Sequence, residues 1–147
     1  MFAKCQRGFS LLEILVVLAL TALMYSLVPP MFSSGGGSEL RASARQLAAG
    51  LRKARGQAIA SRAEVLLTVD TETKQFQVGN DPRNYSLPKT AQLTVHTSRS
   101  EVVEDKRAAI RFYPDGSSTG GAITVANGGG SFRVDVNWLT GSVVILD

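Results

Sequence analysis

The chain has 147 residues, 44% of them apolar, and its 16 Lys and Arg residues against 12 Asp and Glu give a formal net charge of +4. That length suits one globular domain rather than two. The single Cys cannot form an internal disulfide, and Cys5 and His96 together cannot supply a four-ligand zinc site. A Ser-His-Asp or Cys-His catalytic device would have to be built around His96 alone. We therefore expect no enzyme, no metal site and no cofactor.

The apolar residues are concentrated near the N-terminus. Residues 9–28 hold only one charged side chain, Glu13, and a helix of this length just crosses a hydrocarbon core of about 30 Å. We therefore expect a transmembrane helix over residues 9–30. A secretory signal peptide would look similar. However, no A-x-A cleavage site follows Val28, and a carboxylate just inside the apolar run would weaken such a signal.

The charges that precede the apolar run predict its orientation. Lys4 and Arg7 come before it, and no acidic residue precedes Glu13. This asymmetry places residues 1–8 in the cytoplasm and the rest of the chain beyond the membrane.

Residues 7–13 read Arg-Gly-Phe-Ser-Leu-Leu-Glu. This segment resembles the type III signal of prepilins and pseudopilins, G-F-[ST]-L-[LIV]-E, which a membrane-embedded prepilin peptidase recognises. The resemblance implies that cleavage separates Gly8 from Phe9, removes residues 1–8 as a leader, and is followed by methylation of the new amine on Phe9.

Glu13 needs its own explanation, because a carboxylate at the centre of a membrane helix costs roughly 2–3 kcal/mol and less near the interface. It could simply lie at headgroup depth in the first helical turn. The alternative follows from the positive amine that cleavage creates on Phe9. That charge is costly among packed helices unless an opposite charge on a neighbour neutralises it. We therefore expect Glu13 to dock each incoming subunit of a filament.

A flexible linker is predicted over residues 31–38, which are rich in Ser and Gly and follow two prolines. Whether this stretch is helical in a filament stays open. A helix is predicted over residues 39–62, with Ser38 as its N-cap. Its apolar stripe recurs at steps of three and four residues and consists of Leu40, Ala44, Leu47, Leu51, Ala54 and Ala58.

The other faces of this helix carry six basic side chains against one acidic residue, Glu39. The basic residues are Arg41, Arg45, Arg52, Lys53, Arg55 and Arg62. A nucleic-acid surface is one interpretation. No aromatic platform is interleaved with the charges, so we favour a solvated helix close to the membrane or to acidic neighbours in a filament.

From residue 64 to residue 147 the apolar residues alternate with a period of two. A hairpin is predicted from residues 65–69 and 76–78, and further strands begin near residues 91, 110, 123, 132 and 143. The expected fold of the head, residues 39–147, is therefore α+β. A pilin-like helix packs on about seven short antiparallel strands, which form a sheet or a small β-sandwich.

Three details of these strands are also predicted. His96 falls on the polar face of its strand and should be solvated. Trp138 continues the alternation of Phe132, Val134 and Val136. The apolar run 143–146 looks buried on both faces.

Two loop segments carry further patterns. Residues 112–121 read Phe-Tyr-Pro-Asp-Gly-Ser-Ser-Thr-Gly-Gly, and residues 137–141 read Asn-Trp-Leu-Thr-Gly. The first lacks the Lys and following helix of a phosphate loop and the several acids of a Ca²⁺ site, so a glycine-rich turn is the better interpretation.

These segments resemble the F-x-P-D-G-S-S-T-G-G and W-L-T-G-R segments of H-type minor pseudopilins of type II secretion. Ala122 and Ser142 stand where those proteins often carry Arg, and residues 80–108 match no segment of the family.

The resemblance implies a non-catalytic subunit at the tip of a short filament, the pseudopilus, which drives export of folded proteins through an outer-membrane secretin. It places the helix in the bacterial inner membrane and the head in the periplasm. The implied partners are other minor and major pseudopilins, the prepilin peptidase and the inner-membrane assembly platform. Secreted cargo and the secretin are further candidates.

Two other functions stay open. One is a minor pilin of type IV pili, in pilus initiation or DNA uptake. The other is a periplasmic binding protein or enzyme that uses the helix only as a tether. Some type IV pilins bind DNA through an Arg-rich C-terminal motif, and no Arg follows Arg133. A nucleic-acid partner is therefore not expected.

Overall fold

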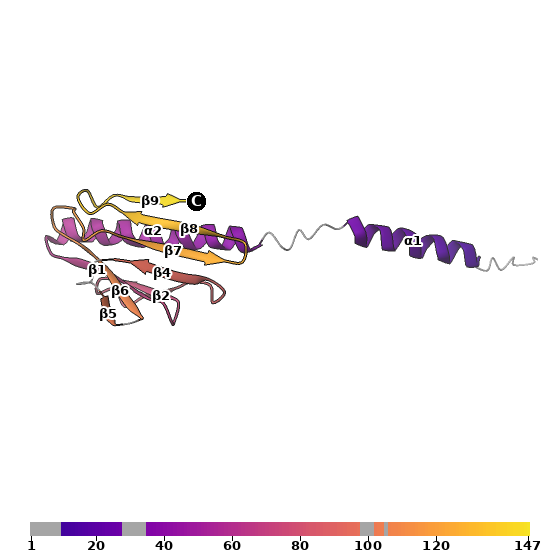
Figure 1. Cartoon of the computed structure of the whole chain (residues 1–147), viewed down its shortest axis with the longest axis horizontal. Coiled ribbons are helices and arrows are strands. Elements are labelled where there is room, and N and C mark those ends of the chain that lie inside the picture. The colour runs from indigo at the N-terminus through magenta and orange to yellow at the C-terminus, as the bar shows by residue number, and fades with distance from the viewer. Residues whose placement is uncertain (1–9, 28–34, 98–101, 105) are drawn as a thin grey trace, which may run out of the picture. The chain divides into compact units, whose positions relative to one another are not determined.

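The computed structural model describes residues 10–27, 35–97, 102–104 and 106–147. The chain divides into two units, residues 1–34 and 35–147. The first unit contains helix α1 (Leu11–Leu27), and the second begins with helix α2 (Gly35–Ser61) (Figure 1). The second unit includes the predicted head and starts four residues earlier, and it is called the head from here on.

Helix α1 is the described part of the predicted transmembrane segment. Residue 9 and residues 28–30 of that prediction lie outside the described residues. Within the described residues, no helix combines the length and the hydropathy that a membrane span needs.

The buried side of α2 is the one that its periodicity predicts. All six residues of the apolar stripe are at most 2% exposed. The helix begins at Gly35, however, so residues 35–38 of the predicted linker are helical, and Ser38 lies inside the helix rather than at its N-cap. Leu40 and Ala44 are packed in the core, and extending a helix that is already nucleated costs far less than starting one. The glycines at the start of α2 still cost about 1 kcal/mol each relative to alanine.

The rest of the head forms two antiparallel sheets. One has the order β3-β2-β1-β6-β5 and the other the order β4-β7-β8-β9. The strands are β1 (Val65–Asp70), β2 (Gln75–Val78), β3 (Asn84–Ser86), β4 (Gln92–His96), β5 (Val102–Glu104), β6 (Arg107–Phe112), β7 (Gly121–Asn127), β8 (Gly130–Val136) and β9 (Val143–Leu146). The α+β class and the hairpin β1–β2 are confirmed, whereas β3 and β5 are short strands within a region that the sequence left unassigned.

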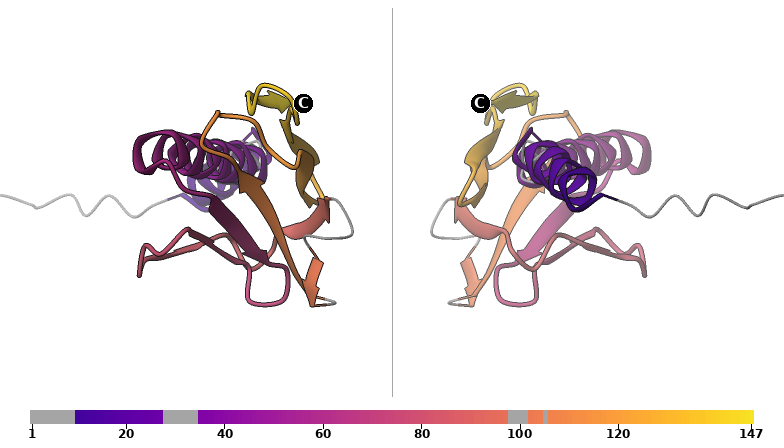
Figure 2. Two further views of the ribbon diagram at one scale, coloured as in Figure 1. Left: turned by 90° about the vertical axis from the view of Figure 1, so that its left-hand side faces the viewer. Right: turned by 90° about the vertical axis from the view of Figure 1, so that its right-hand side faces the viewer.

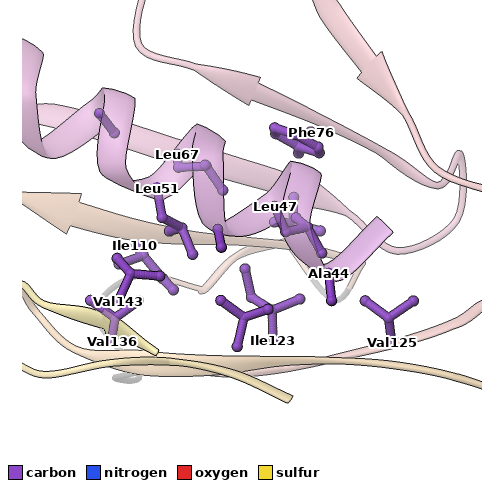
Figure 3. Close-up of a cluster of buried hydrophobic side chains, with 14 of the residues drawn as sticks. Ala44, Leu47, Leu51, Leu67, Phe76, Ile110, Ile123, Val125, Val136 and Val143 are labelled. Atoms are coloured by element: carbon purple, nitrogen blue, oxygen red, sulfur yellow. The ribbon is translucent and has the colours of Figure 1, made fainter. Parts of the chain in front are cut away.

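Helix α2 lies against both sheets (Figure 2). One hydrophobic core joins it to them. Leu67 pairs with Ile110 across β1 and β6, and Ile123 pairs with Val134 across β7 and β8. These side chains and Phe76 of β2 pack around Leu47 and Leu51 of α2. Figure 3 shows Phe76 and Leu67 above the two leucines and Ile110 and Ile123 below them. The helix thus closes the angle between the sheets.

Two predictions at the end of the chain are wrong. Trp138 does not continue the buried alternation, because β8 ends at Val136 and the Trp138 side chain is 65% exposed. Strand β9 is not buried on both faces either, since Val144 and Leu146 are 50% and 44% exposed. Strand β9 lies at the edge of its sheet with one face uncovered, a placement that depends on distant strands and that a local apolar run does not reveal.

A charged cluster ties the β2–β3 turn to α2. The Asp81 carboxylate accepts a hydrogen bond of 2.6 Å from Lys53 Nζ and is bound by the Arg83 guanidinium at 3.0 Å. The hydrogen bonds from Arg83, and then the one from Lys53, hold the pKa of Asp81 below its usual range. Tyr85 stacks on Phe76 with ring centroids 5.0 Å apart, which brings β3 against the same cluster.

Two glycines within α2 predict opposite responses to alanine. A Cβ at Gly50 would lie 2.7 Å from Phe76 Cε2, whereas nothing lies within 4 Å of a Cβ at Gly56. We expect Gly56→Ala to raise the free energy of unfolding by about 0.5–1 kcal/mol, because alanine is the better helix former. Gly50→Ala should lower it by about 1–3 kcal/mol, because the rigid ring must move. Urea unfolding of the detergent-solubilised chain, followed by circular dichroism, measures both, and stabilisation by both substitutions would contradict this packing.

Candidate assembly surfaces

Helix α1 is apolar on every side, and Glu13 in its first turn is its only charged residue. Its large apolar side chains are between 47% and 83% exposed; they include Leu11, Leu12, Ile14, Leu15, Val16, Val17, Leu18, Leu20, Leu23 and Met24. A helix that is hydrophobic all round is normally buried in a membrane or among other helices. The described residues of the first unit leave this surface of α1 uncovered.

Glu13 lies where the helix starts. Its backbone N–H donates to the Ser10 carbonyl at 3.0 Å, and its side chain is exposed. A carboxylate in the first turn interacts favourably with the positive end of the helix dipole. Gly8 and Phe9, the predicted cleavage and methylation residues, lie outside the described residues. The structure therefore places Glu13 at the start of α1 and does not describe the residues predicted to act with it.

In the head, the two loop segments picked out from the sequence lie together. The β6–β7 loop (residues 113–120) and the β8–β9 loop (residues 137–142) are joined by a hydrogen bond of 2.8 Å from the Ser118 N–H to the Trp138 carbonyl. Arg55 of α2 donates through Nε to the Gly116 carbonyl at 3.0 Å. Arg55 thus ties the first loop to α2.

Internal hydrogen bonds define each loop. The Asp115 carboxylate accepts from the Ser117 hydroxyl at 2.6 Å and from the Ser117 N–H at 2.9 Å, and these bonds lower the pKa of Asp115. In the second loop, Asn137 Oδ1 accepts from the N–H groups of Leu139 and Thr140 at 2.9 and 3.0 Å. This Asx turn ends the pleated alternation of β8 and turns Trp138 outwards.

Gly141 is the point of closest approach between the loops. Its φ is +62°, and a Cβ there would lie 2.1 Å from the Gly116 carbonyl oxygen and 2.9 Å from Arg55 Nε. Only glycine combines this backbone conformation with so small a gap. Residues 113–120 form the loop between β6 and β7, and Gly116 and Gly141 lie where the two loops pack.

Beside the loops, the outer face of the β4-β7-β8-β9 sheet carries an open groove of about 940 Å³. Apolar side chains line part of it, among them Trp138, Val144 and Leu146, and the ion pair of Arg133 with Asp135 at 3.1 Å lines another part. His96 also lines the groove and is exposed, as its place on the polar face of the strand predicts. No group of three metal-ligating side chains occurs in the described part of the chain.

The sequence did not predict what the basic residues of α2 do. Arg52 Nη2 donates to the Val143 carbonyl at 3.1 Å, while Lys53 and Arg55 bind the partners described above. The cationic side of the helix is therefore only partly a solvated face. Arg52 and Arg55 are three residues apart, so the sequence could have placed both side chains on the same side of the helix. Their acceptors are backbone carbonyls, which every residue has, so the sequence does not show which ones they bind.

Two sequence families match the chain. The family described as Type II transport protein GspH matches residues 43–141, and the Prokaryotic N-terminal methylation motif matches residues 3–24. The Type II secretion system protein H of Xanthomonas campestris pv. campestris is 35% identical over 138 residues, which are 93% of this chain and 81% of that protein.

The fold is similar to two solved structures. The minor pseudopilin EpsH from the Type 2 Secretion System of Vibrio cholerae gives a TM-score of 0.58 at 18% identity, covering 74% of this chain and 96% of that one. The type IV minor pilin FimU of Pseudomonas aeruginosa gives a TM-score of 0.59 at 16% identity, covering 75% and 90%. At these identities the likeness shows the fold alone.

An apolar helix with a methylation motif, followed by a head in which one long helix packs on antiparallel sheets, defines a pilin-like subunit. The family match and the relative with 35% identity are more specific. The chain belongs to the GspH family, the H-type minor pseudopilins of type II secretion.

The contact between the loops can be tested at Gly141. We expect Gly141→Ala to lower the free energy of unfolding by about 1–3 kcal/mol, because the new methyl group meets a carbonyl oxygen and the residue must keep a positive φ. Gly128 is the control, since nothing lies within 4 Å of a Cβ there, and Gly128→Ala should stay within about 0.5 kcal/mol. Equal urea midpoints for the two variants would contradict the assigned role of Gly141.

Proposed function

We propose that this minor pseudopilin is incorporated at the tip of a periplasmic pseudopilus that drives export of folded proteins across the outer membrane. Residues 9–30 would anchor it in the bacterial inner membrane, with the head in the periplasm. The observation that carries the proposal is the single carboxylate of α1, Glu13, at the fifth position after the proposed Gly8–Phe9 cleavage bond.

The physical role of Glu13 follows from charge pairing in an apolar environment. Cleavage leaves a positively charged ammonium group on Phe9, and methylation of this group keeps the charge. Among packed helices this charge is costly unless a carboxylate of a neighbouring subunit lies against it. Glu13 supplies that carboxylate, and the apolar surface of α1 supplies the packing around the pair. Glu13 thus sets the depth at which each subunit enters the filament.

The partners follow from this role. Other pseudopilins of the system cover α1 and contact the head. The prepilin peptidase removes residues 1–8, and the inner-membrane assembly platform receives the processed subunit. Secreted cargo or the secretin would meet the head, whose work is recognition rather than catalysis.

A type IV pilus is the second candidate system, because the head is as similar in fold to FimU as to EpsH. The fold therefore does not distinguish the two systems. The relative with 35% identity, a type II secretion protein over most of the chain, favours secretion. The genomic neighbourhood separates the two, since the proposal expects genes for a secretin and a secretion ATPase rather than pilus or competence genes.

Processing of the N-terminus is the first test. In membrane-extracted protein from cells that contain the secretion system, intact-mass analysis should find the chain without residues 1–8 and with an N-methylated Phe9. A tethered enzyme or binding protein has no need of this step. An intact Met1 on the mature protein would overturn the assembly proposal.

The second test replaces Glu13. We expect Glu13→Val to leave leader cleavage intact and to reduce incorporation into pseudopili by about tenfold, because the neighbouring ammonium is left unpaired. The matched control is Leu12→Val, which changes the adjacent side chain without removing a charge and should incorporate normally. Immunoblots of sheared filaments measure incorporation. Normal incorporation of Glu13→Val would contradict the proposed docking role.

A further inference from the structure

The described strands leave four edges, β3 and β5 in one sheet and β4 and β9 in the other. Edge strands invite pairing with another chain unless they are short, polar or bulged. Strands β3 and β5 have three residues each, β5 carries a register shift, and β4 presents polar side chains on its outer face. Strand β9 is also short, with four residues, but its pairing carries no register shift and its side chains are apolar. It reads Val-Val-Ile-Leu and pairs with β8 at four successive positions.

The backbone of β9 shows which groups face the open side. The Ser142 carbonyl accepts a hydrogen bond from the Asn137 N–H at 3.0 Å and so points toward the β8 side. The next carbonyl, that of Val143, points to the opposite side, where it accepts a hydrogen bond from Arg52 of α2. In an antiparallel strand, the N–H and C=O groups of alternate residues point to the same side. Ile145 therefore directs both of its backbone groups to the open edge.

A row of arginines runs beside this edge. Arg41, Arg45 and Arg52 are separated by four and seven residues, which places them on one side of α2. Arg52 reaches Val143, and Arg41 Nη2 lies 3.8 Å from Asp147 Oδ2, so the row follows β9 in the opposite chain direction. Figure 1 shows α2 and β9 extending along the head in this way.

Arg45 lies between these two contacts. It is exposed and has no ion pair within the described residues. The arginine row therefore carries three positive charges, and Asp147 is the one carboxylate bound to it in the described part of the chain. Any partner strand added to β9 would have one of its faces beside this row.

We propose that the β9 edge receives an extended segment of another pseudopilin of the same filament. On this segment, acidic residues alternate with apolar ones. The acidic side chains face the arginine row, and the apolar side chains cover Val144 and Leu146. Alternate residues of a strand are about 6.8 Å apart, and Arg41 and Arg45 are about 6 Å apart along the helix axis, so two successive acids meet these two arginines. Arg52 lies about 10.5 Å further along the helix and is bound to the Val143 carbonyl. This inference rests on the proposed function, which supplies the partner.

The test uses the full chain, expressed together with its secretion system. A photo-crosslinking amino acid replaces Val144 and, as the matched control, Thr94 on the outer face of the opposite edge strand β4. We expect an adduct with another pseudopilin at residue 144 and none at residue 94. Mass spectrometry of the adduct should identify a peptide with acids at alternate positions. No adduct at 144, equal adducts at both positions, or an adduct with a second copy of this chain or with cargo would overturn the proposal.

Charge reversal then tests the arginine row. Arg45→Glu should reduce the adduct at residue 144 by about fivefold, since the partner's acids are now repelled. Arg45→Lys keeps the charge and should retain most of the adduct. Lys89→Glu reverses an exposed charge away from β9 and should leave the adduct unchanged. An adduct that is insensitive to Arg45→Glu would overturn the acidic character of the partner segment.

Leader processing and filament incorporation are measured in the same samples. A chain that is processed and incorporated but gives no adduct overturns the β9 proposal alone. A chain that is neither processed nor incorporated contradicts the proposed function, and the β9 proposal fails with it.

Discussion

The arrangement of the head depends on how closely α2 approaches the strands. Its buried side consists largely of small residues, namely Ala44, Ala48, Gly50, Ala54 and Ala58. Because these residues project little, Leu47 and Leu51 reach both sheets, and the Phe76 ring lies directly against the backbone at Gly50. One helix can therefore close the angle between two sheets that do not share a strand. Larger residues along this side would separate the sheets from the helix and from each other.

This close approach also determines what the basic residues of α2 can reach. Arg52, Lys53 and Arg55 follow one another within one turn and bind three separate segments, at Val143, Asp81 and Gly116. Backbone carbonyls at the ends of strands need donors, and an arginine can supply them while its own charge stays near water. The helix thus holds the sheets by apolar packing and the loops by charged hydrogen bonds. The apolar packing sets how close α2 lies to these segments, and this closeness lets the charged hydrogen bonds form.

The sequence predicted the elements whose pattern is local. The stripe from Leu40 to Ala58, the hairpin of β1 and β2, and the solvated His96 all follow from periodicity, and the structure confirms them. The sequence did not predict features that depend on distant partners. The exposure of Trp138 follows from an Asx turn at Asn137, and the open face of β9 follows from its position in the strand order. Among the predicted site residues, only Glu13 lies in the described part of the chain, so its pairing with Phe9 stays a prediction.

The two helices differ in whether their apolar surfaces are covered. The apolar side of α2 is covered by its own head, whereas the described residues of the first unit leave the apolar surface of α1 exposed. Burial of apolar surface is strong but not directional. In the proposed filament, α1 would therefore supply most of the association energy, and Glu13, its only charge, would supply the register. Choice among neighbours needs a surface with its own pattern of charge and hydrogen-bonding groups, and in the head the arginine row beside β9 has that character.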